Sequence, residues 1–365
     1  MKLAVTKEAL LEGLLRTQNV VSNRPTLPIL TNALLEAADD GLWITTTDLE
    51  VGIRCRVEAR VEKTGSTTIP ARKLVSIIRE LPASEIILDV DSKNVASIRC
   101  GASFFKVYGL PKEEFPVFPE PKETKSLTIR QSELKDGLRK TSYAISTDEA
   151  RYVLNGILFS LFENKLTLVA TDGRRLALFD SDLEFPKSDE GEFILPTKAV
   201  TELQRLLGDE GDVVISNSPN LVSFEVSGAK LVSKLVEGNY PNYRQVIPGE
   251  ARERITLERE AFLNCVRRVS ILSSDKTSSV RLNFTRNTLD ITANTPEVGE
   301  AKESMSINYK GADISIAFNP EFLMDPLRNL SNDEIFLELI DEMSPGVIKI
   351  ATPFLYVIMP MRVSQ

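Results

Sequence analysis

Apolar and polar positions alternate with two periods along this chain, and the order of the two periods repeats. Apolar residues recur at helical spacing in six segments, as at Leu10 and Leu14 in the first of them. The six predicted helices form two sets of three, residues 7–22, 131–146 and 258–273, and residues 69–81, 195–207 and 318–330. Within each set the copies lie about 125 residues apart. An internal repeat of this kind predicts one structural unit that occurs three times.

Strands are predicted around these helices in the same order in each copy. A short strand (LAVT, LTIR or RITL) precedes the first helix. Alternating apolar residues predict β-meanders at 168–180 and 280–294, and further strands at 84–100, 211–226 and 333–339. Short strands with turn residues plus two helices are typical of α+β domains with an antiparallel sheet. The predicted fold class is therefore α+β, with three tandem copies of a domain in which two helices pack on antiparallel sheet.

Two proline-rich stretches separate the copies, at residues 109–126 and 238–254. Both are polar and lack a regular period, and proline prevents a helix or an interior strand from continuing through them. Domain boundaries are therefore predicted near residues 125 and 252. The predicted domains are residues 1–125, 126–252 and 253–365.

The composition is that of an ordinary globular protein, with 42% hydrophobic and 26% charged residues. No apolar run is long enough to span a bilayer, and the first residues (MKLAVTKEALLEG) lack the apolar core of a signal peptide. A cytoplasmic location is therefore expected. The three cysteines, Cys55, Cys100 and Cys265, lack metal-binding spacing and are expected to be reduced thiols.

No catalytic constellation of residues is found in the sequence. The chain contains no histidine, the commonest general base and metal ligand. It has no phosphate-binding glycine loop, nucleophile elbow or dinucleotide-binding motif, and carboxylates such as Asp172 and Asp180 have no paired base. No catalytic residues, metal site or cofactor are predicted. The chain is expected not to be an enzyme, with an enzyme that uses carboxylates alone as an alternative.

Charge is distributed unevenly along the chain. The formal net charge is −8, yet 15 basic and 10 acidic residues lie in the helical stretches 5–22, 129–145, 256–272, 70–81, 196–207 and 319–330. Two equivalent helical positions are basic in every copy: Arg16, Lys140 and Arg267, and Arg79, Arg205 and Arg328. Basic helices on an acidic body favour a polyanion on the helical face. Solvated helix surfaces, and cations that complement helix dipoles, explain the pattern as well.

Three local motifs have two interpretations each. Asp172–Gly173 within ATDGRRLAL predicts a hairpin turn, because glycine tolerates positive φ, and a plain turn is the favoured reading of the motif alone. YVIMPMRV predicts either an edge strand interrupted by Pro360, with methionines as an adaptable surface, or a core strand. In SNRPTLPIL, Arg24 either contacts a phosphate or lies in a turn.

Six motifs match one known family in sequence and order: RPTLPIL (24–30), IPARK (69–73), RYVLNGILF (151–159), ATDGRRLAL (170–178), NYPNYR (239–244) and YVIMPMR (356–362). On these motifs the chain resembles, over its whole length, the β sliding clamps, the beta subunits of bacterial DNA polymerase III. The resemblance implies a head-to-tail homodimer, in which six domains form a ring with helices inside and sheets outside. Duplex DNA passes through such a ring without sequence readout. Further implied partners are the polymerase III catalytic subunit, the clamp loader, and other polymerases and repair proteins with short peptide motifs.

The resemblance also implies three sets of site residues. A hydrophobic pocket for partner peptides is implied at Leu154, Thr171, Gly173, Arg174, Arg175, Leu176, Pro241, Val246, Phe322, Val357, Ile358, Met359, Pro360, Met361 and Arg362. DNA contacts are implied at Arg24, Arg72, Lys73, Arg79, Lys140, Arg151, Tyr152, Lys198 and Arg205. The ring interface is implied at Phe105, Lys106, Val107, Ile271, Leu272, Glu297, Glu300 and Glu303.

This chain departs from the family pattern at the implied pocket. The family often has histidine where Arg174 stands and a basic residue where Gln245 stands, and Ser364 and Gln365 extend past the usual end. The alternative function is a three-domain protein-interaction scaffold that does not encircle DNA.

Overall fold

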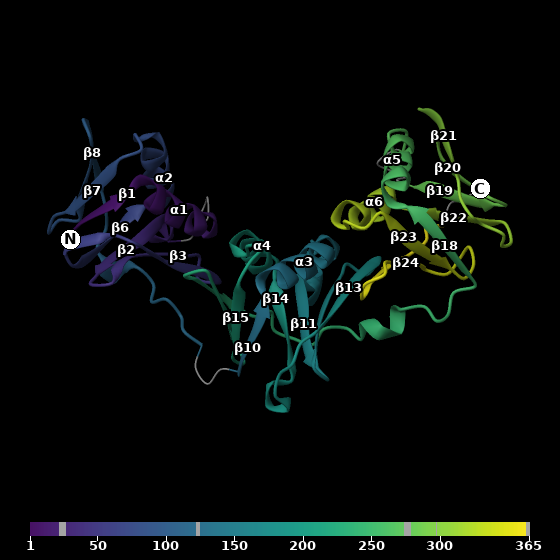
Figure 1. The fold of residues 1–365 in the computed structure, drawn as a ribbon, viewed down its shortest axis with the longest axis horizontal. Helices are drawn as coiled ribbons and strands as arrows, with labels where there is room; N and C mark the ends of the chain where they lie inside the picture. Colours follow the sequence, from purple (N-terminus) through teal and green to yellow (C-terminus); the bar gives the residue numbers. More distant parts are fainter. Residues whose placement is uncertain (22–26, 122–124, 274–278, 297, 363–365) are drawn as a thin grey trace. The chain divides into compact units, whose positions relative to one another are not determined.

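The computed structural model describes residues 1–21, 27–121, 125–273, 279–296 and 298–362 (Figure 1). The chain divides into two compact units. The first consists of Met1–Lys135 with Lys198–Leu235, and the second of Asp136–Thr197 with Val236–Gln365. Because these divisions lie away from residues 125 and 252, the domain boundaries expected there remain predictions.

Six α-helices lie within the described residues, each overlapping a helix expected from the apolar spacing. They are α1 (Lys7–Thr17), α2 (Ala71–Glu80), α3 (Gln131–Thr141), α4 (Thr197–Leu206), α5 (Arg259–Ser270) and α6 (Pro320–Asn329). Each begins directly after a strand or one residue later. Asn319 caps α6 by accepting a hydrogen bond from the amide of Glu321 at 2.9 Å. No helix in the described part of the chain is both long and apolar enough to cross a membrane.

The first helix of each of the first two copies ends earlier than the spacing predicts. The hydroxyl of Thr17 donates to the carbonyl of Gly13 at 3.1 Å, and Thr141 donates to Gly137 at 2.8 Å. Such hydroxyls compete for the carbonyls that continue an α-helix. Short 3₁₀ turns follow, at Gln18–Val20 and Ser142–Ala144.

The first unit contains two antiparallel sheets (Figure 1). One has the order β5-β1-β7-β8-β9, formed by β1 (Lys2–Thr6), β5 (Arg60–Lys63), β7 (Glu85–Val90), β8 (Val95–Cys100) and β9 (Ser103–Tyr108). The other has the order β10-β15-β16-β17-β4-β3-β2-β6, formed by β2 (Asn32–Ala38), β3 (Gly41–Thr47), β4 (Val51–Val57), β6 (Gly65–Pro70), β10 (Lys125–Arg130), β15 (Asp212–Asn217), β16 (Leu221–Val226) and β17 (Ala229–Lys234).

Helices α1 and α2 bury one apolar face each in the core of this unit. Leu10 and Leu14 of α1 and Leu74 of α2 are at most 2% exposed and belong to one hydrophobic cluster. Gly13 allows α1 to approach the sheet closely, because a Cβ there would lie 2.4 Å from Cγ2 of Val57. Burying these faces leaves the charged side chains of both helices at the surface.

The eight-stranded sheet of the first unit continues from the first predicted domain into the second. Strand β17 pairs with β4, from Ala229 opposite Cys55 to Ser233 opposite Val51. Main-chain hydrogen bonds therefore join segments from the two predicted domains into one sheet.

The second unit also contains two antiparallel sheets. The larger has the order β14-β11-β12-β13-β25-β24-β23-β18, formed by β11 (Gly156–Phe162), β12 (Lys165–Thr171), β13 (Arg175–Asp182), β14 (Gly191–Pro196), β18 (Glu253–Glu258), β23 (Glu334–Leu339), β24 (Gly346–Lys349) and β25 (Phe354–Ile358). The smaller has the order β21-β20-β19-β22, formed by β19 (Val280–Thr285), β20 (Thr288–Thr295), β21 (Gly299–Ser306) and β22 (Ile314–Phe318).

The interpretation of the chain end as an edge strand is wrong. Strand β25 pairs with β13 on one side, where Ile358 faces Arg175, and with β24 on the other, where Ile358 faces Gly346. Pro360 follows the end of the strand, so its missing N–H removes no hydrogen bond from either ladder. The alternative interpretation, a core strand, is confirmed.

Candidate functional site

A tight turn joins β12 to β13 in the second unit. Gly173 has a φ of 83°, a conformation that glycine adopts without steric cost. One carboxylate oxygen of Asp172, Oδ1, accepts hydrogen bonds from the amides of Arg174 at 2.9 Å and Arg175 at 3.0 Å. The predicted hairpin at Asp172–Gly173 is therefore confirmed.

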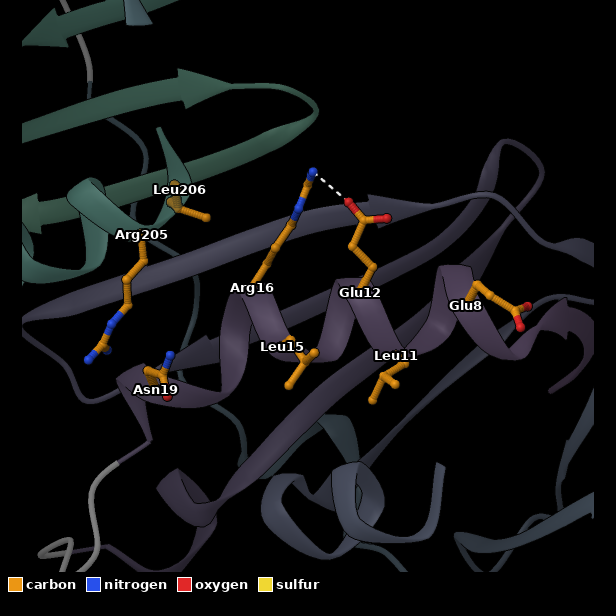
Figure 2. A pocket seen from close by; sticks show the side chains of 8 residues that line it. All are labelled: Glu8, Leu11, Glu12, Leu15, Arg16, Asn19, Arg205 and Leu206. Carbon is orange, nitrogen blue, oxygen red and sulfur yellow. Dashed lines mark hydrogen bonds and ion pairs between the residues drawn. The ribbon is translucent and has the colours of Figure 1, made fainter. Parts of the chain in front are cut away.

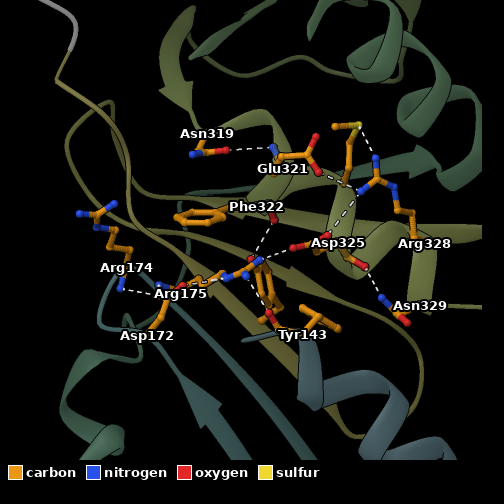
Figure 3. Close-up of polar contacts among 12 residues, drawn as sticks. Tyr143, Asp172, Arg174, Arg175, Asn319, Glu321, Phe322, Asp325, Arg328 and Asn329 are labelled. Atoms are coloured by element: carbon orange, nitrogen blue, oxygen red, sulfur yellow. Dashed lines mark hydrogen bonds and ion pairs between the residues drawn. The ribbon is translucent and has the colours of Figure 1, made fainter. Parts of the chain in front are cut away.

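The side chain of Arg175 connects this turn to α6, as Figure 3 shows. Its Nε donates to Oδ2 of Asp172 at 3.0 Å, and its Nη1 donates to Oδ2 of Asp325 at 2.5 Å. Its Nη2 donates to the carbonyl of Tyr143 at 2.6 Å. The guanidinium carbon lies 4.3 Å from the centroid of the Phe322 ring. With only 10% of this side chain exposed, Arg175 is an internal cross-link.

Burial and charge act in opposite directions on this network. Burial disfavours the charged guanidinium, but the carboxylate of Asp325 favours it, and the pKa of Arg175 is raised overall. Burial raises the pKa of the Tyr356 hydroxyl, which donates a hydrogen bond to the carbonyl of Phe322 at 2.8 Å. Arg175 therefore keeps its charge in this network, and Tyr356 keeps the proton that it donates to Phe322.

Sequence reasoning missed most of this network. The sequence pattern presents Asp172 as a carboxylate without a paired base, and no motif points to Asp325 or Tyr143. One feature of the sequence does indicate the network, the second arginine after the turn. This arginine stands at the start of a buried strand, and a buried guanidinium requires carboxylates to compensate its charge. One of these carboxylates, Asp172, lies in the hairpin itself, but the other, Asp325, comes from α6, which the hairpin motif does not reveal.

The hairpin, the second joint and the chain end meet in one hydrophobic cluster. Leu176 of β13 and Val357 of β25 pack there with Tyr243 of the joint. The amide of Met359 then donates to the carbonyl of Arg174 at 3.0 Å, which fixes the chain end beside the turn. Three exposed apolar side chains adjoin this cluster along the chain, and we call them the apolar patch: Val246, Met359 and Met361, which are 51%, 44% and 37% exposed.

The predicted pocket residues all lie in the second unit and differ in exposure. Leu154, Leu176, Val357 and Ile358 are buried. Thr171, Arg175, Phe322 and Pro360 are partly exposed. Gly173, Arg174, Pro241, Val246, Met359, Met361 and Arg362 are exposed. Some of the predicted pocket residues are therefore packed inside the second unit, and the others lie at its surface.

The basic residues predicted to contact DNA have different environments in the first unit. Lys73 and Arg79 on α2 are exposed, and neither has a hydrogen-bond or ion-pair partner among the described residues. The guanidinium of Arg72 donates to the carbonyl of Val21 at 3.2 Å. The amine of Lys198 pairs with Asp48 and donates to the carbonyl of Val20 at 2.8 Å. Lys198 thus ties α4 to the first predicted domain.

Arg205 lines a surface pocket between α1 and the end of α4 in the first unit (Figure 2). Its Nη1 lies 2.6 Å from Oε1 of Glu202. Burial raises the pKa of Glu202, although Arg205 opposes this rise. On the facing helix, Arg16 pairs with Glu12 at 2.7 Å. Both arginines at this pocket therefore already have a carboxylate partner.

The residues of the second unit that are predicted to contact DNA also differ in their exposure. The side chain of Lys140 is only 8% exposed, pairs with Asp136 at 2.5 Å and lies 5.2 Å from the ring centroid of Phe179. Because its amine is buried, a DNA contact at Lys140 has no support in the structure. Arg151 and Tyr152 are exposed, the latter by 58%. Arg24 lies outside the described residues.

The predicted interface residues lie on or next to the edge strands of two sheets. Strand β9 is the last strand of its sheet in the first unit and carries Phe105, which is 38% exposed. Strand β21 is the last strand of its sheet in the second unit, and Ile271 after α5 is 75% exposed. The remaining described candidates are Lys106 and Glu300, which are exposed, and Val107, Leu272 and Glu303, which are partly exposed. Glu297 lies outside the described residues.

Glu303 already has a partner within the chain. Its two carboxylate oxygens accept hydrogen bonds from Nε and Nη2 of Arg268 at 2.7 and 2.9 Å. This pairing lowers the pKa of Glu303. Glu300 is the more exposed of these two carboxylates on β21.

Comparison with known proteins covers the whole chain. Models of the N-terminal, central and C-terminal domains of the DNA polymerase III beta subunit match residues 1–119, 128–242 and 244–362. The beta sliding clamp of Chlamydia muridarum is 36% identical over 362 residues, which are 99% of both chains. That of Pseudomonas putida is 35% identical over 367 residues, covering 99% of this chain and all of its own.

Solved structures agree with these matches. The DnaN sliding clamp from Bartonella birtlesii bound to griselimycin is 36% identical, with a TM-score of 0.94 and full coverage of both chains. The DNA polymerase sliding clamp from Bacillus subtilis is 29% identical, with a TM-score of 0.95 and full coverage of both chains. The predicted α+β class with three tandem clamp domains is thereby confirmed. The chain belongs to the family of the DNA polymerase III beta subunit, the beta sliding clamps.

Proposed function

We propose that two copies of this chain join head to tail into a closed ring that encircles duplex DNA and tethers the replicative polymerase. The ring binds DNA without reading its sequence and catalyses no reaction itself. One observation carries this proposal beyond family membership: β9 in the first matched domain and β21 in the third are edge strands of their sheets, and both carry residues that the resemblance implies at the ring interface.

Unpaired strand edges favour association with another chain. Each presents main-chain donors and acceptors that a second strand satisfies. Because β9 and β21 belong to different domains, pairing β9 of one copy with β21 of another is a heterologous contact, and two such contacts close a ring. Phe105 and Ile271 supply exposed apolar area next to these edges, and Lys106 and Glu300 supply opposite charges.

The attraction to DNA is weak and electrostatic in this proposal. Lys73 and Arg79 are the candidates on α2 whose charges have no partner among the residues that the structure describes. Phosphate contacts of this kind are independent of sequence and weaken as salt increases. Retention on DNA then depends on ring closure, so the net charge of −8 does not prevent function.

Partner proteins bind the second unit at the apolar patch. Exposed methionines adapt to different ligands, and the buried side chains beneath them hold the surface in place. We assign to this surface short peptides of the polymerase III catalytic subunit, the clamp loader, and other polymerases and repair proteins. The relative from Bartonella birtlesii, solved bound to griselimycin, supports ligand binding by clamps of this fold.

The mass of the particle in solution tests the ring. Light scattering should give twice the 40.6 kDa of the single chain at micromolar concentration. Once loaded by a clamp loader, the protein should remain on nicked circular DNA and leave the same DNA after linearisation. A stable monomer, or equal retention on both DNA forms, would favour the alternative of a protein-binding scaffold that does not encircle DNA.

Replacing Lys73 and Arg79 together by alanine should reduce binding to a short duplex. If both residues contact phosphates in both copies of the ring, four cations are lost, and the slope of log affinity against log salt should fall in magnitude by about 3.6. Fluorescence anisotropy with a labelled duplex at several salt concentrations measures this slope.

Lys198→Ala is the matched control, because that amine is already bonded to Asp48 and Val20. It should leave the slope nearly unchanged and lower the stability of the first unit instead. A change of slope for Lys198→Ala equal to that of the double variant would contradict the assignment of DNA contacts to α2.

A further inference from the structure

Four of the six basic residues at the repeated helical positions are paired with a carboxylate of their own helix. The pairs are Arg16 with Glu12 at 2.7 Å, Lys140 with Asp136 at 2.5 Å, Arg205 with Glu202 at 2.6 Å, and Arg328 with Glu321 at 2.9 Å. The guanidinium groups of Arg79 and Arg267, at the other two positions, are exposed and have no hydrogen-bond or ion-pair partner among the described residues. The repeat thus combines free cations with cations that are already paired.

Glu202 differs from the other three acidic partners because its side chain is buried. Only 5% of it is exposed, whereas Glu12 and Glu321 are mostly exposed and Asp136 is partly exposed. Burial raises the pKa of Glu202, and the nearby charge of Arg205 opposes this rise. A buried carboxylate without a cation is unfavourable, so Glu202 holds its partner more firmly than a surface carboxylate would.

The guanidinium of Arg205 has one donor that this pair occupies. The arginine side chain is 54% exposed and lines the surface pocket between α1 and the end of α4 (Figure 2). Its Nη1 donates to Oε1 of Glu202, and a hydrogen bond to Glu202 competes with one to a phosphate. Lys198, the other cation that acts on Glu202, is held by Asp48 and the carbonyl of Val20, so it does not take the place of Arg205.

We propose that Glu202 is a positioning residue, which restrains Arg205 and so keeps the attraction of the ring to DNA weak. The assignment rests on the proposed function, because it concerns the contacts between the helices and the phosphates. A closed ring is retained without a tight grip, and each further phosphate contact adds to the electrostatic attraction. A carboxylate that offsets one of these cations therefore favours movement along the duplex.

Glu202→Met in the full-length protein tests this role. Methionine has nearly the same length and fits a buried site without a charge. A labelled short duplex should bind about five- to tenfold more tightly at low salt, as expected when one arginine in each copy gains a phosphate contact. The slope of log affinity against log salt should increase in magnitude by about 1.8, from two freed cations in the ring. Fluorescence anisotropy at several salt concentrations measures both values.

Two further variants separate restraint of Arg205 from a plain loss of negative charge. Glu8→Met removes an exposed carboxylate that lines the same pocket and has no hydrogen-bond or ion-pair partner among the described residues, so the slope should stay nearly unchanged. In an Arg205→Met background, Glu202→Met should no longer raise the affinity, because the arginine through which it acts is absent. A gain that persists in that background, or an unchanged slope in Glu202→Met alone, would overturn the proposal.

Failure of the ring itself gives a different result. If the unaltered protein neither binds the duplex nor remains on nicked circular DNA, the proposed function is contradicted, and the role of Glu202 with it. Should Glu202→Met fail to fold, Glu202→Gln takes its place, because the amide keeps the shape and removes the charge. A smaller gain in the same direction is then expected, since a neutral amide holds a guanidinium less firmly, and the absence of any gain counts against the restraint.

Discussion

An Arg175→Met variant should lose about 3 kcal/mol of unfolding free energy in the second unit. Removing one partner of a buried ion pair costs about 3–5 kcal/mol, because the remaining charge stays buried without compensation. The lower end applies, since the side chains of Asp172 and Asp325 are 18% and 23% exposed. The carbonyl of Tyr143 also loses its donor. Denaturant unfolding, followed by hydrogen exchange of amides in β13 and α6, measures the loss.

Arg174→Met is the matched control for this variant. It removes the same side chain one residue earlier, where the guanidinium is exposed and has no partner among the described residues. Surface substitutions of this kind usually change stability by less than about 0.5 kcal/mol. Equal losses for the two variants would show that Arg175 is not the cross-link between the hairpin and α6.

A chain that ends at Ile358 should lose at least about 30-fold in affinity for an apolar partner peptide, because a few buried anchors carry most of the energy of such contacts. The truncation removes Met359 and Met361, two of the three exposed side chains of the apolar patch. Strand β25 is retained between β13 and β24, so the sheet beneath the patch remains. Anisotropy with a labelled peptide measures the affinity.

Light scattering on the same truncated chain provides the control. Neither β9 nor β21 is altered, so the particle should keep the mass of two chains. Unchanged peptide affinity would place the docking surface elsewhere. Loss of both peptide binding and the dimer would instead indicate that the shortened chain is misfolded. In that case the full-length double variant Met359→Ala, Met361→Ala tests the docking surface. It should lose the same affinity for the peptide while the particle keeps the mass of two chains.

Local features account for the elements that the sequence predicts well. Each helix follows a strand, and apolar spacing such as Leu10 and Leu14 marks the face that is buried. The turn at Asp172–Gly173 is determined by one residue that tolerates positive φ and one whose carboxylate caps the following amides. These signals act over a few residues, so they are readable without knowledge of the fold.

Long-range contacts account for the predictions that failed or stayed open. Lys140 and Lys198 stay predicted DNA contacts, although the amine of Lys140 lies over the Phe179 ring and that of Lys198 pairs with Asp48. The i to i+4 pair of Asp136 and Lys140 was visible in the sequence, whereas the covering ring was not. Likewise, Pro360 suggested an edge strand because the partner on the other side of β25 was unknown.

The sequence by itself determined the threefold repeat, the helices, the hairpin turn and the family, because spacing, turn residues and motif order are local properties. Only the tertiary structure decided which basic residues are free and which are internal. It distinguished Arg174 from Arg175, two identical side chains one position apart, by placing Asp325 of α6 next to the second alone. The physical reason is that the environment of a charge depends on residues far away in the chain, and those are brought together only by folding.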